Sequence, residues 1–108
     1  MKTEYKQTEA SRELSLYSVN DHEVYTNAVQ PVIRNLAKKL NAGIFDNDKA
    51  RKAFANVALF AAKKYARDFG GVYYKIFSAE DRRLAGVDLF NYFVEDIIEE
   101  SEEMASKS

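Results

Sequence analysis

Glycine divides most of this chain into blocks that are each long enough for one helix. Gly43 follows the first block, and Gly70 with Gly71 follows the second. A glycine just past the end of a helix is common because it adopts the left-handed backbone that ends the helix without steric cost. The only proline, Pro31, lies inside the first block. This spacing predicts three helices that are separated at these glycines.

The first block predicts a helix from Asn20 or Asp21 to about Asn41. Either polar residue can accept hydrogen bonds from the free N–H groups at a helix start. Pro31 falls nearly opposite the apolar stripe, where it should bend the helix around the core, so we expect a kink and not a break. The stripe spans about 100° of the helix and contains Tyr25, Val29, Val32, Ile33, Leu36 and Leu40.

The second block predicts a helix that begins within residues 46–48 and ends near Phe69. Its core-facing stripe is rich in alanine, which lets a neighbouring helix approach closely. The stripe contains Ala50, Phe54, Val57, Ala58, Ala61 and Tyr65.

The third predicted helix opens at Ser78, which can cap it together with Asp81, and runs to about Glu100 or beyond. Its residues 84–98 are apolar on more than one side. This helix is therefore either central in the fold or in contact with a partner.

The chain has 108 residues, of which 46% are hydrophobic, enough for one domain with its own core. We predict an all-α, mostly helical fold: a compact three-helix domain over residues 19–100. Residues 1–18 mix charged, serine and threonine side chains without a helical stripe and are predicted to form a mobile or partly docked arm. Residues 101–108 are predicted to form an acidic tail that frays. The β-prone segment 72–77 is either a connector or a minor short strand paired with residues 13–19.

The composition excludes several kinds of chemistry. The chain has no cysteine, which rules out disulfides, thiolate metal sites and cysteine nucleophiles and suits a reducing cytoplasm. The N-terminus lacks the apolar run of a signal peptide, and no segment approaches the roughly 18 apolar residues of a membrane span. We therefore expect a cytoplasmic protein that does not enter a membrane.

Catalytic and metal-binding patterns are also missing from the sequence. The only histidine, His22, has no serine or cysteine motif to act with, and no Glu-x-x-His spacing for a dinuclear metal site occurs. There is no glycine-rich phosphate-binding loop and no dinucleotide fingerprint. We predict a protein that is not an enzyme and that binds no metal or cofactor.

Basic side chains gather on the outer face of the second predicted helix. On a helical wheel they fall within about 60° of one another and form a row about 27 Å long. Residues 34–67 contain nine basic and two acidic side chains, a net charge of +7. The row, which Lys38 and Lys39 extend, can follow a phosphate backbone or an acidic protein surface; alternatively it is an ordinary solvated helix face. We use the name basic face for Lys49, Lys52, Lys63 and Arg67 together with Phe60 at their border.

The third predicted helix offers two alternative surfaces. Its side chains Leu89, Tyr92 and Phe93 can pair with a second copy of the chain and form a homodimer. Its C-terminal end carries six carboxylates with no base before Lys107, which is typical of a solubilising tail but can also imitate the phosphates of DNA. The six are Glu95, Asp96, Glu99, Glu100, Glu102 and Glu103.

The stretches YTNAVQP, NLAKKLNAGIFDNDKA, AKKYARDFG and FSAEDRRLAG resemble small helical hypothetical proteins of tailed bacteriophages. The shared pattern covers about residues 24–98 and is moderately specific. The resemblance implies a phage origin and a place in the host cytoplasm, but no activity and no functional residue, because the family has no established activity. The matching positions are Tyr25, Asn27, Ala28, Pro31, Asn35, Leu36, Gly43, Asp46, Ala50, Phe54, Tyr65, Phe77, Ser78 and Arg82.

These features predict a small non-catalytic binding protein of phage type. We expect it to contact a host or viral macromolecule, either nucleic acid or an acidic protein surface, through the basic face. Two alternatives remain. One is a self-associating structural or interaction protein that uses the third helix, and the other is an inhibitor of host defence that presents the acidic helix as an imitation of DNA.

Overall fold

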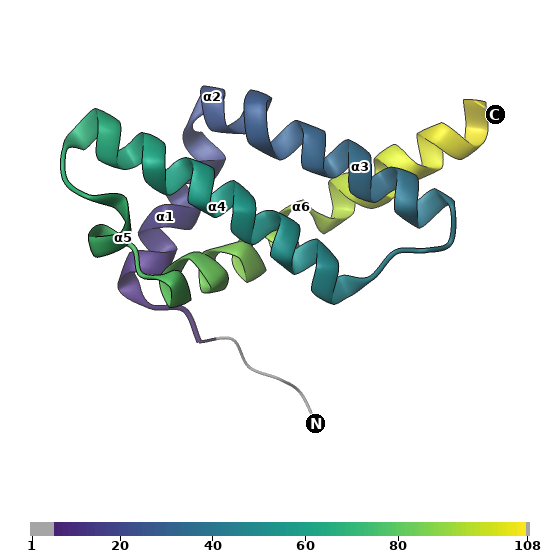
Figure 1. The fold of residues 1–108 in the computed structure, drawn as a ribbon. Coiled ribbons are helices and arrows are strands. Elements are labelled where there is room, and N and C mark those ends of the chain that lie inside the picture. Colours follow the sequence, from purple (N-terminus) through teal and green to yellow (C-terminus); the bar gives the residue numbers. More distant parts are fainter. Residues whose placement is uncertain (1–5, 108) are drawn as a thin grey trace.

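A computed structural model describes residues 6–107, and in this part of the chain it contains five helices and no strand (Figure 1). The prediction of an all-α fold is confirmed, but the prediction of a three-helix domain is wrong: the three predicted helices are present with others. Two further helices, α1 and α5, were not predicted. The first helix is α1 (Glu9–Asn20). The second is a continuous helix with three parts: α2 (His22–Val24), the π-helical turn η1 (Tyr25–Val29) and α3 (Gln30–Asn41). The remaining helices are α4 (Asn47–Phe69), α5 (Tyr73–Ile76) and α6 (Ala79–Lys107).

The predicted helix starts and stops coincide with real caps. The Asp46 carboxylate accepts the Lys49 N–H at 2.9 Å in front of α4. In front of α6, the Ser78 hydroxyl accepts the Asp81 N–H at 3.1 Å while the Asp81 carboxylate accepts the Ser78 N–H at 3.0 Å. Gly70 ends α4 with a positive φ of 90°. Local sequence therefore determines where α4 and α6 begin and where α4 ends.

The distortion expected at Pro31 is present as a π-helical turn. The Gln30 N–H donates to the Tyr25 carbonyl, five residues back, instead of the carbonyl four residues back. A proline ring collides with the carbonyl four residues earlier in a regular α-helix, and a widened turn relieves this collision. The helix continues through this turn to Asn41 without a break.

The prediction of an arm over residues 1–18 is wrong for residues 9–18, which belong to helix α1. Residues 9–20 form α1, which begins at a reciprocal cap: the Ser11 N–H donates to Thr8 Oγ1 at 3.0 Å, and the Thr8 N–H donates to Ser11 Oγ at 2.8 Å. Residues 1–5 of the predicted arm lie outside the described residues. The domain therefore begins earlier in the chain than residue 19.

The buried side of α1 is built mainly from serine, which is why it lacks an apolar stripe in the sequence. Leu14 is fully buried, and Ser11, Ser15 and Ser18 are buried beside it. The Ser15 hydroxyl donates to the Ser11 carbonyl at 3.0 Å, and the Ser18 hydroxyl donates to the Leu14 carbonyl at 2.7 Å. A hydroxyl that is satisfied by its own helix can be buried without an unpaired polar group, so this stripe packs closely on its neighbours.

The predicted minor strand pairing does not form. Residues 13–19 lie inside α1, so they offer no strand edge, and residues 73–76 form the short helix α5. Phe77 follows α5 and is almost completely buried, with its ring edge-on to Tyr65 at 5.1 Å between centres. The β-prone composition of this segment reflects the aromatic side chains that anchor it to α4.

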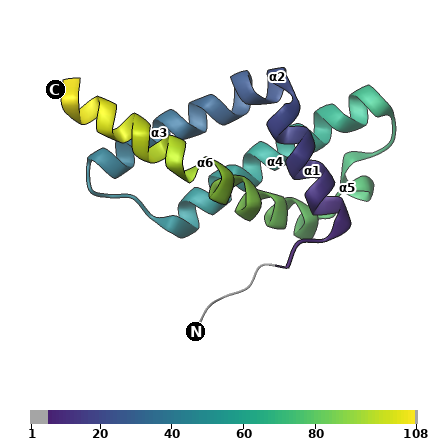
Figure 2. The same cartoon turned by 180° about the vertical axis from the view of Figure 1, so that it is seen from behind.

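The helices form two layers. In Figure 1, α3 and α4 lie in front of α6, and Figure 2 shows α1 across the back of α4. The principal extents of 47, 36 and 17 Å agree with a flat body about two helices thick. None of the helices formed by the described residues has the length and apolar character that a membrane crossing requires.

The long helix α6 is the centre of the core, because it contacts α1, α3 and α4. Phe54 of α4 stacks on Phe93 of α6 with ring centres 5.9 Å apart and an interplanar angle of 7°, and Leu89 is fully buried. The same stripe continues through Ser101 and Met104, which pack on the domain, so α6 stays helical to Lys107. The predicted fraying of residues 101–108 is therefore corrected for the described residues 101–107.

Candidate nucleic-acid interface

The outer face of α4 carries three exposed lysines, Lys49, Lys52 and Lys63. None of them forms an ion pair within residues 6–107. Phe60 lies on the same face and is 37% exposed. These four members of the basic face are therefore exposed on the outer side of α4.

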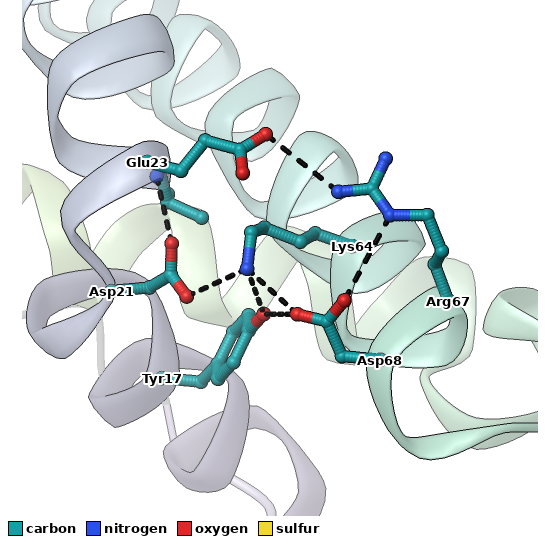
Figure 3. Close-up of polar contacts among 7 residues, drawn as sticks. Tyr17, Asp21, Glu23, Lys64, Arg67 and Asp68 are labelled. Carbon is teal, nitrogen blue, oxygen red and sulfur yellow. Dashed lines mark hydrogen bonds and ion pairs between the residues drawn. The ribbon is translucent and has the colours of Figure 1, made fainter.

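Arg67, the remaining member of the basic face, is exposed but forms ion pairs with two carboxylates of the same chain. Its Nη2 atom lies 3.6 Å from a carboxylate oxygen of Glu23, and its Nε atom lies 3.8 Å from Asp68 (Figure 3). Both carboxylates reduce the field that Arg67 presents to solvent. The structure therefore separates Arg67 from the three lysines, although all four share one stripe in the sequence.

Next to Arg67, a polar network joins α4 to the corner between α1 and α2 (Figure 3). The Lys64 ammonium donates to Asp21 at 2.9 Å, to Asp68 at 2.7 Å and to the Tyr17 hydroxyl at 3.3 Å. Asp21 also caps α2 by accepting the Val24 N–H at 3.0 Å. We use the name Lys64 network for Tyr17, Asp21, Lys64 and Asp68.

The Lys64 network changes the pKa values of its members. Hydrogen bonds to Asp68 and Asp21 raise the pKa of Lys64, and the hydrogen bond from Lys64 lowers the pKa of Asp68. Burial acts to raise the pKa of Asp21, but hydrogen bonds from Lys64 and Val24 outweigh it, so this pKa is lowered. Burial raises the pKa of Tyr17. At neutral pH Lys64 therefore stays protonated and acts as a structural cation, not as a base or nucleophile.

The Lys64 network could not be predicted as a whole from the sequence. Lys64 and Asp68 are four residues apart, which is a visible helical pairing signal. Asp21 and Tyr17, however, are 43 and 47 residues away from Lys64 in the chain. Only the packing of α1 against α4 brings them to the ammonium group.

An open groove of about 270 Å³ lies between α4 and α6 and extends the basic face. Lys52 lines it together with two arginines that the sequence analysis did not assign to the face, Arg51 and Arg83. Arg51 pairs with Asp48 at 3.0 Å, and Arg83 pairs with Glu80 at 2.7 Å. Both arginines therefore have a carboxylate partner, whereas Lys52 forms no ion pair among the described residues. The lining residues are Asp48, Arg51, Lys52, Ala55, Arg83 and Val87.

Lys38 and Lys39 belong to the last turn of α3, and Lys49 belongs to the first turn of α4. Figure 1 places the C-terminal end of α3 and the N-terminal end of α4 at the same side of the molecule, joined by the loop over residues 42–46. Lys38 is exposed and Lys39 is half-buried. This end of the molecule therefore extends the positive surface beyond α4.

Of the three residues predicted to mediate self-association, two are buried and one is exposed. Leu89 is completely buried and Phe93 is 3% exposed, so both belong to the core of this chain and are unavailable to a second copy. Tyr92 is 62% exposed. The third predicted helix is apolar on two sides because it is central within its own domain, which was one of the two explanations open from the sequence.

The carboxylates of α6 line a second groove, of about 250 Å³, against α3. Arg34 of α3 is its only basic lining residue. Within residues 6–107 there is no group of three or more histidine, cysteine or acidic side chains arranged to hold a metal ion. The groove is lined by Tyr25, Gln30, Ile33, Arg34, Asp96, Glu99, Glu100 and Glu103.

Comparisons with protein-family profiles, with curated protein sequences and with solved structures find no significant match to this chain.

Proposed function

We propose that this protein is a non-catalytic nucleic-acid-binding protein whose basic face contacts the phosphate backbone. The observation that supports the proposal is the set of exposed lysines on α4, Lys49, Lys52 and Lys63, none of which has an ion-pair partner in the described part of the chain. We further propose a phage origin for the protein, so that the nucleic acid would be that of the host or of the virus.

The arrangement of these lysines suits a phosphate chain. From Lys49 to Lys63 the helix rises about 21 Å, which is long enough to meet several phosphates of one strand. Lys38 and Lys39 at the end of α3 extend the positive surface beyond α4. A continuous line of phosphates can use all of these groups together, whereas an acidic protein surface must match their positions one by one.

The division of charge within the molecule supports the same proposal. The chain has a net charge of only -1, so its total charge does not attract nucleic acid. The carboxylates of α6 line a groove against α3, whereas α4 carries lysines that form no ion pair with any described residue. A molecule with separated charges orients itself as it approaches a polyanion, and the lysine side then leads.

The proposal is tested by fluorescence polarisation with labelled DNA and RNA, single-stranded and duplex, at low and moderate salt. The variant carries Lys49→Glu and Lys52→Glu, and the control carries Arg12→Glu and Lys107→Glu, which change the net charge by the same amount elsewhere. We expect the variant to lose about tenfold or more in affinity and the control to lose less than about threefold. For three phosphate contacts, log affinity should fall with log salt at a slope of about -2 to -3.

Nucleic acid that binds the variant and the control equally well contradicts the proposal. Wild-type protein that binds no nucleic acid at low salt contradicts it as well. In that case the acidic side of α6 becomes the leading candidate, because its carboxylates lie on a helix that stays regular to Lys107. Capture of a DNA-binding partner that is lost with Glu99→Lys and Glu103→Lys would then assign the protein as an imitation of DNA.

A further inference from the structure

Two tyrosines at the start of α5 lie next to two cations. The Lys63 Nζ atom and the Arg82 guanidinium carbon each lie 5.4 Å from the centre of the Tyr73 ring. The Tyr74 ring lies beside the Tyr73 ring, with the ring centres 5.3 Å apart, and Tyr74 is 54% exposed. We use the name tyrosine cluster for Lys63, Tyr73, Tyr74 and Arg82.

The fold assembles the tyrosine cluster from three elements. Lys63 comes from α4, the tyrosines come from α5, and Arg82 comes from the first turns of α6. Gly70 and Gly71 connect α4 to this turn with φ values of 90° and 103°, a backbone that other residues rarely adopt. The chain can therefore reverse sharply enough to place α5 beside α4.

The charge of the tyrosine cluster is not compensated inside the molecule. Neither Lys63 nor Arg82 takes part in an ion pair among the described residues. Among the described residues, the Nη1 atom of Arg82 has no hydrogen-bond partner, and the guanidinium lies over the Tyr73 ring. Because Lys63 is exposed and has no ion-pair partner among the described residues, its ammonium group is accessible to an anion.

We propose that the tyrosine cluster binds an unpaired base of a single-stranded nucleic acid, with the base stacked on Tyr74 and a neighbouring phosphate next to Lys63. An exposed tyrosine ring stacks on any base, and cations beside it hold the backbone. Lys63 is also a member of the basic face, so a strand that follows α4 reaches Tyr74. In a duplex the bases are paired and stacked on each other, so the ring gains no contact.

This inference rests on the proposed function and identifies the class of nucleic acid. The test compares a labelled oligothymidylate of about 16 nucleotides with a duplex of the same length. The variants are Tyr74→Ala and Tyr74→Phe, and the matched control is Tyr92→Ala, which removes a tyrosine of similar exposure (62%) from the acidic helix α6. All variants are assayed by fluorescence polarisation, with circular dichroism to confirm helicity.

We expect wild-type protein to prefer the single strand. Tyr74→Ala should lower the single-strand affinity by about 5- to 150-fold, the range for loss of one stacked base, and leave duplex affinity within about twofold. Tyr74→Phe keeps the ring face and should retain the affinity. Tyr92→Ala should have no effect. A base analogue such as 2-aminopurine in the oligonucleotide should change its fluorescence on binding wild-type protein and not Tyr74→Ala.

Other outcomes overturn the inference. If single strand and duplex bind equally and Tyr74→Ala changes neither, while Lys49→Glu with Lys52→Glu still abolishes binding, the proposed function stands and the tyrosine cluster has no part in it. If no nucleic acid binds, both proposals fail. Tyr74-dependent binding to vesicles of phosphatidylcholine and phosphatidylserine without binding to oligothymidylate would assign the cluster to a membrane surface, where the exposed Phe69 and Val72 would also insert.

Discussion

The backbone of Gly86 in α6 lies directly against the backbone of Ala55 in α4, at the point where the two longest helices cross. A Cβ atom placed on Gly86 would lie 2.6 Å from the Ala55 nitrogen and 2.7 Å from its Cα atom. Backbone atoms cannot move aside as a flexible side chain does, so the helices approach this closely only because the residue is glycine.

Gly86→Ala should therefore separate α4 from α6 and lower the free energy of unfolding by about 1–3 kcal/mol or more. This loss outweighs the gain in helix propensity of up to about 1 kcal/mol that alanine brings over glycine. Urea unfolding followed by circular dichroism measures the balance. A more stable variant would show that the two helices do not cross in contact at this position.

Leu14→Ala tests whether α1 is part of the domain. Leu14 is fully buried, and its truncation should lower the free energy of unfolding by about 2–5 kcal/mol. Leu16 lies on the same helix and is 65% exposed, so Leu16→Ala is the matched control and should change stability by less than about 0.5 kcal/mol. Equal effects of the two substitutions in thermal or urea unfolding would mean that α1 does not dock as described.

Asp21→Asn tests the Lys64 network through its pH dependence. Asparagine is also a good helix cap, so the variant removes the charge and keeps the cap. The folded-state pKa values of Asp21 and Asp68 lie below their ordinary value of 3.8. Their stabilising contribution is therefore complete above about pH 4 and is lost as the pH falls through the folded-state pKa values.

At pH 7 we expect Asp21→Asn to be less stable than wild type by about 1–2 kcal/mol, because Lys64 keeps only one of its two carboxylate partners. The difference should shrink as the pH falls below about 4, since Asp21 then becomes neutral in the wild type as well. Urea unfolding at pH 7 and at successively lower pH values measures it. A difference that stays constant with pH would mean that the charge of Asp21 does not stabilise the fold.

Met104→Ala tests whether the end of α6 is anchored. Met104 is half-buried against the domain, and its truncation should lower the free energy of unfolding by about 1–2 kcal/mol. Glu102 is exposed on the same turn, so Glu102→Ala should be neutral within about 0.5 kcal/mol. Amide hydrogen exchange should also show protection that extends past Ser101 in wild type and retreats in Met104→Ala. Absence of protection beyond Glu100 in wild type would support a frayed tail.

Much of the fold was predictable because three helices carry their boundaries in local sequence. Asp46 and Ser78 cap their helices with side chains that lie three residues from the N–H groups they accept, and Gly70 ends α4 with a backbone that favours glycine. These are interactions over less than one turn of helix, so no knowledge of the fold is needed to see them. The exposure of the lysines on α4 follows in the same way from helical periodicity.

The first helix was missed because its buried stripe is polar. The hydroxyls of Ser11, Ser15 and Ser18 each donate to an oxygen four residues earlier in the chain. These serines can therefore be buried when a neighbouring helix covers them. A periodicity of apolar residues contains no such signal. The end of α6 was misjudged for a related reason, since Ser101 and Met104 form a weak stripe among carboxylates.

The assignment of side chains to a core or to a free surface depended on the tertiary structure. Leu89 and Phe93 were candidates for a dimer contact, but α6 is surrounded by α1, α3 and α4, so they are buried within one chain. Arg67 shares a helical stripe with Lys63, yet only Arg67 meets carboxylates, because the α1 and α2 corner packs beside it.

The sequence by itself determined the helical class, both ends of two helices, the start of a third and the row of cations on α4. Each depends on neighbours within about one or two turns of one helix. Only the tertiary structure decided which cations keep their charge free, how Tyr73 and Tyr74 come to lie beside Lys63 and Arg82, and which face of α6 is interior. These relationships join residues that are far apart in the chain, and they arise when packing fixes the distances between helices.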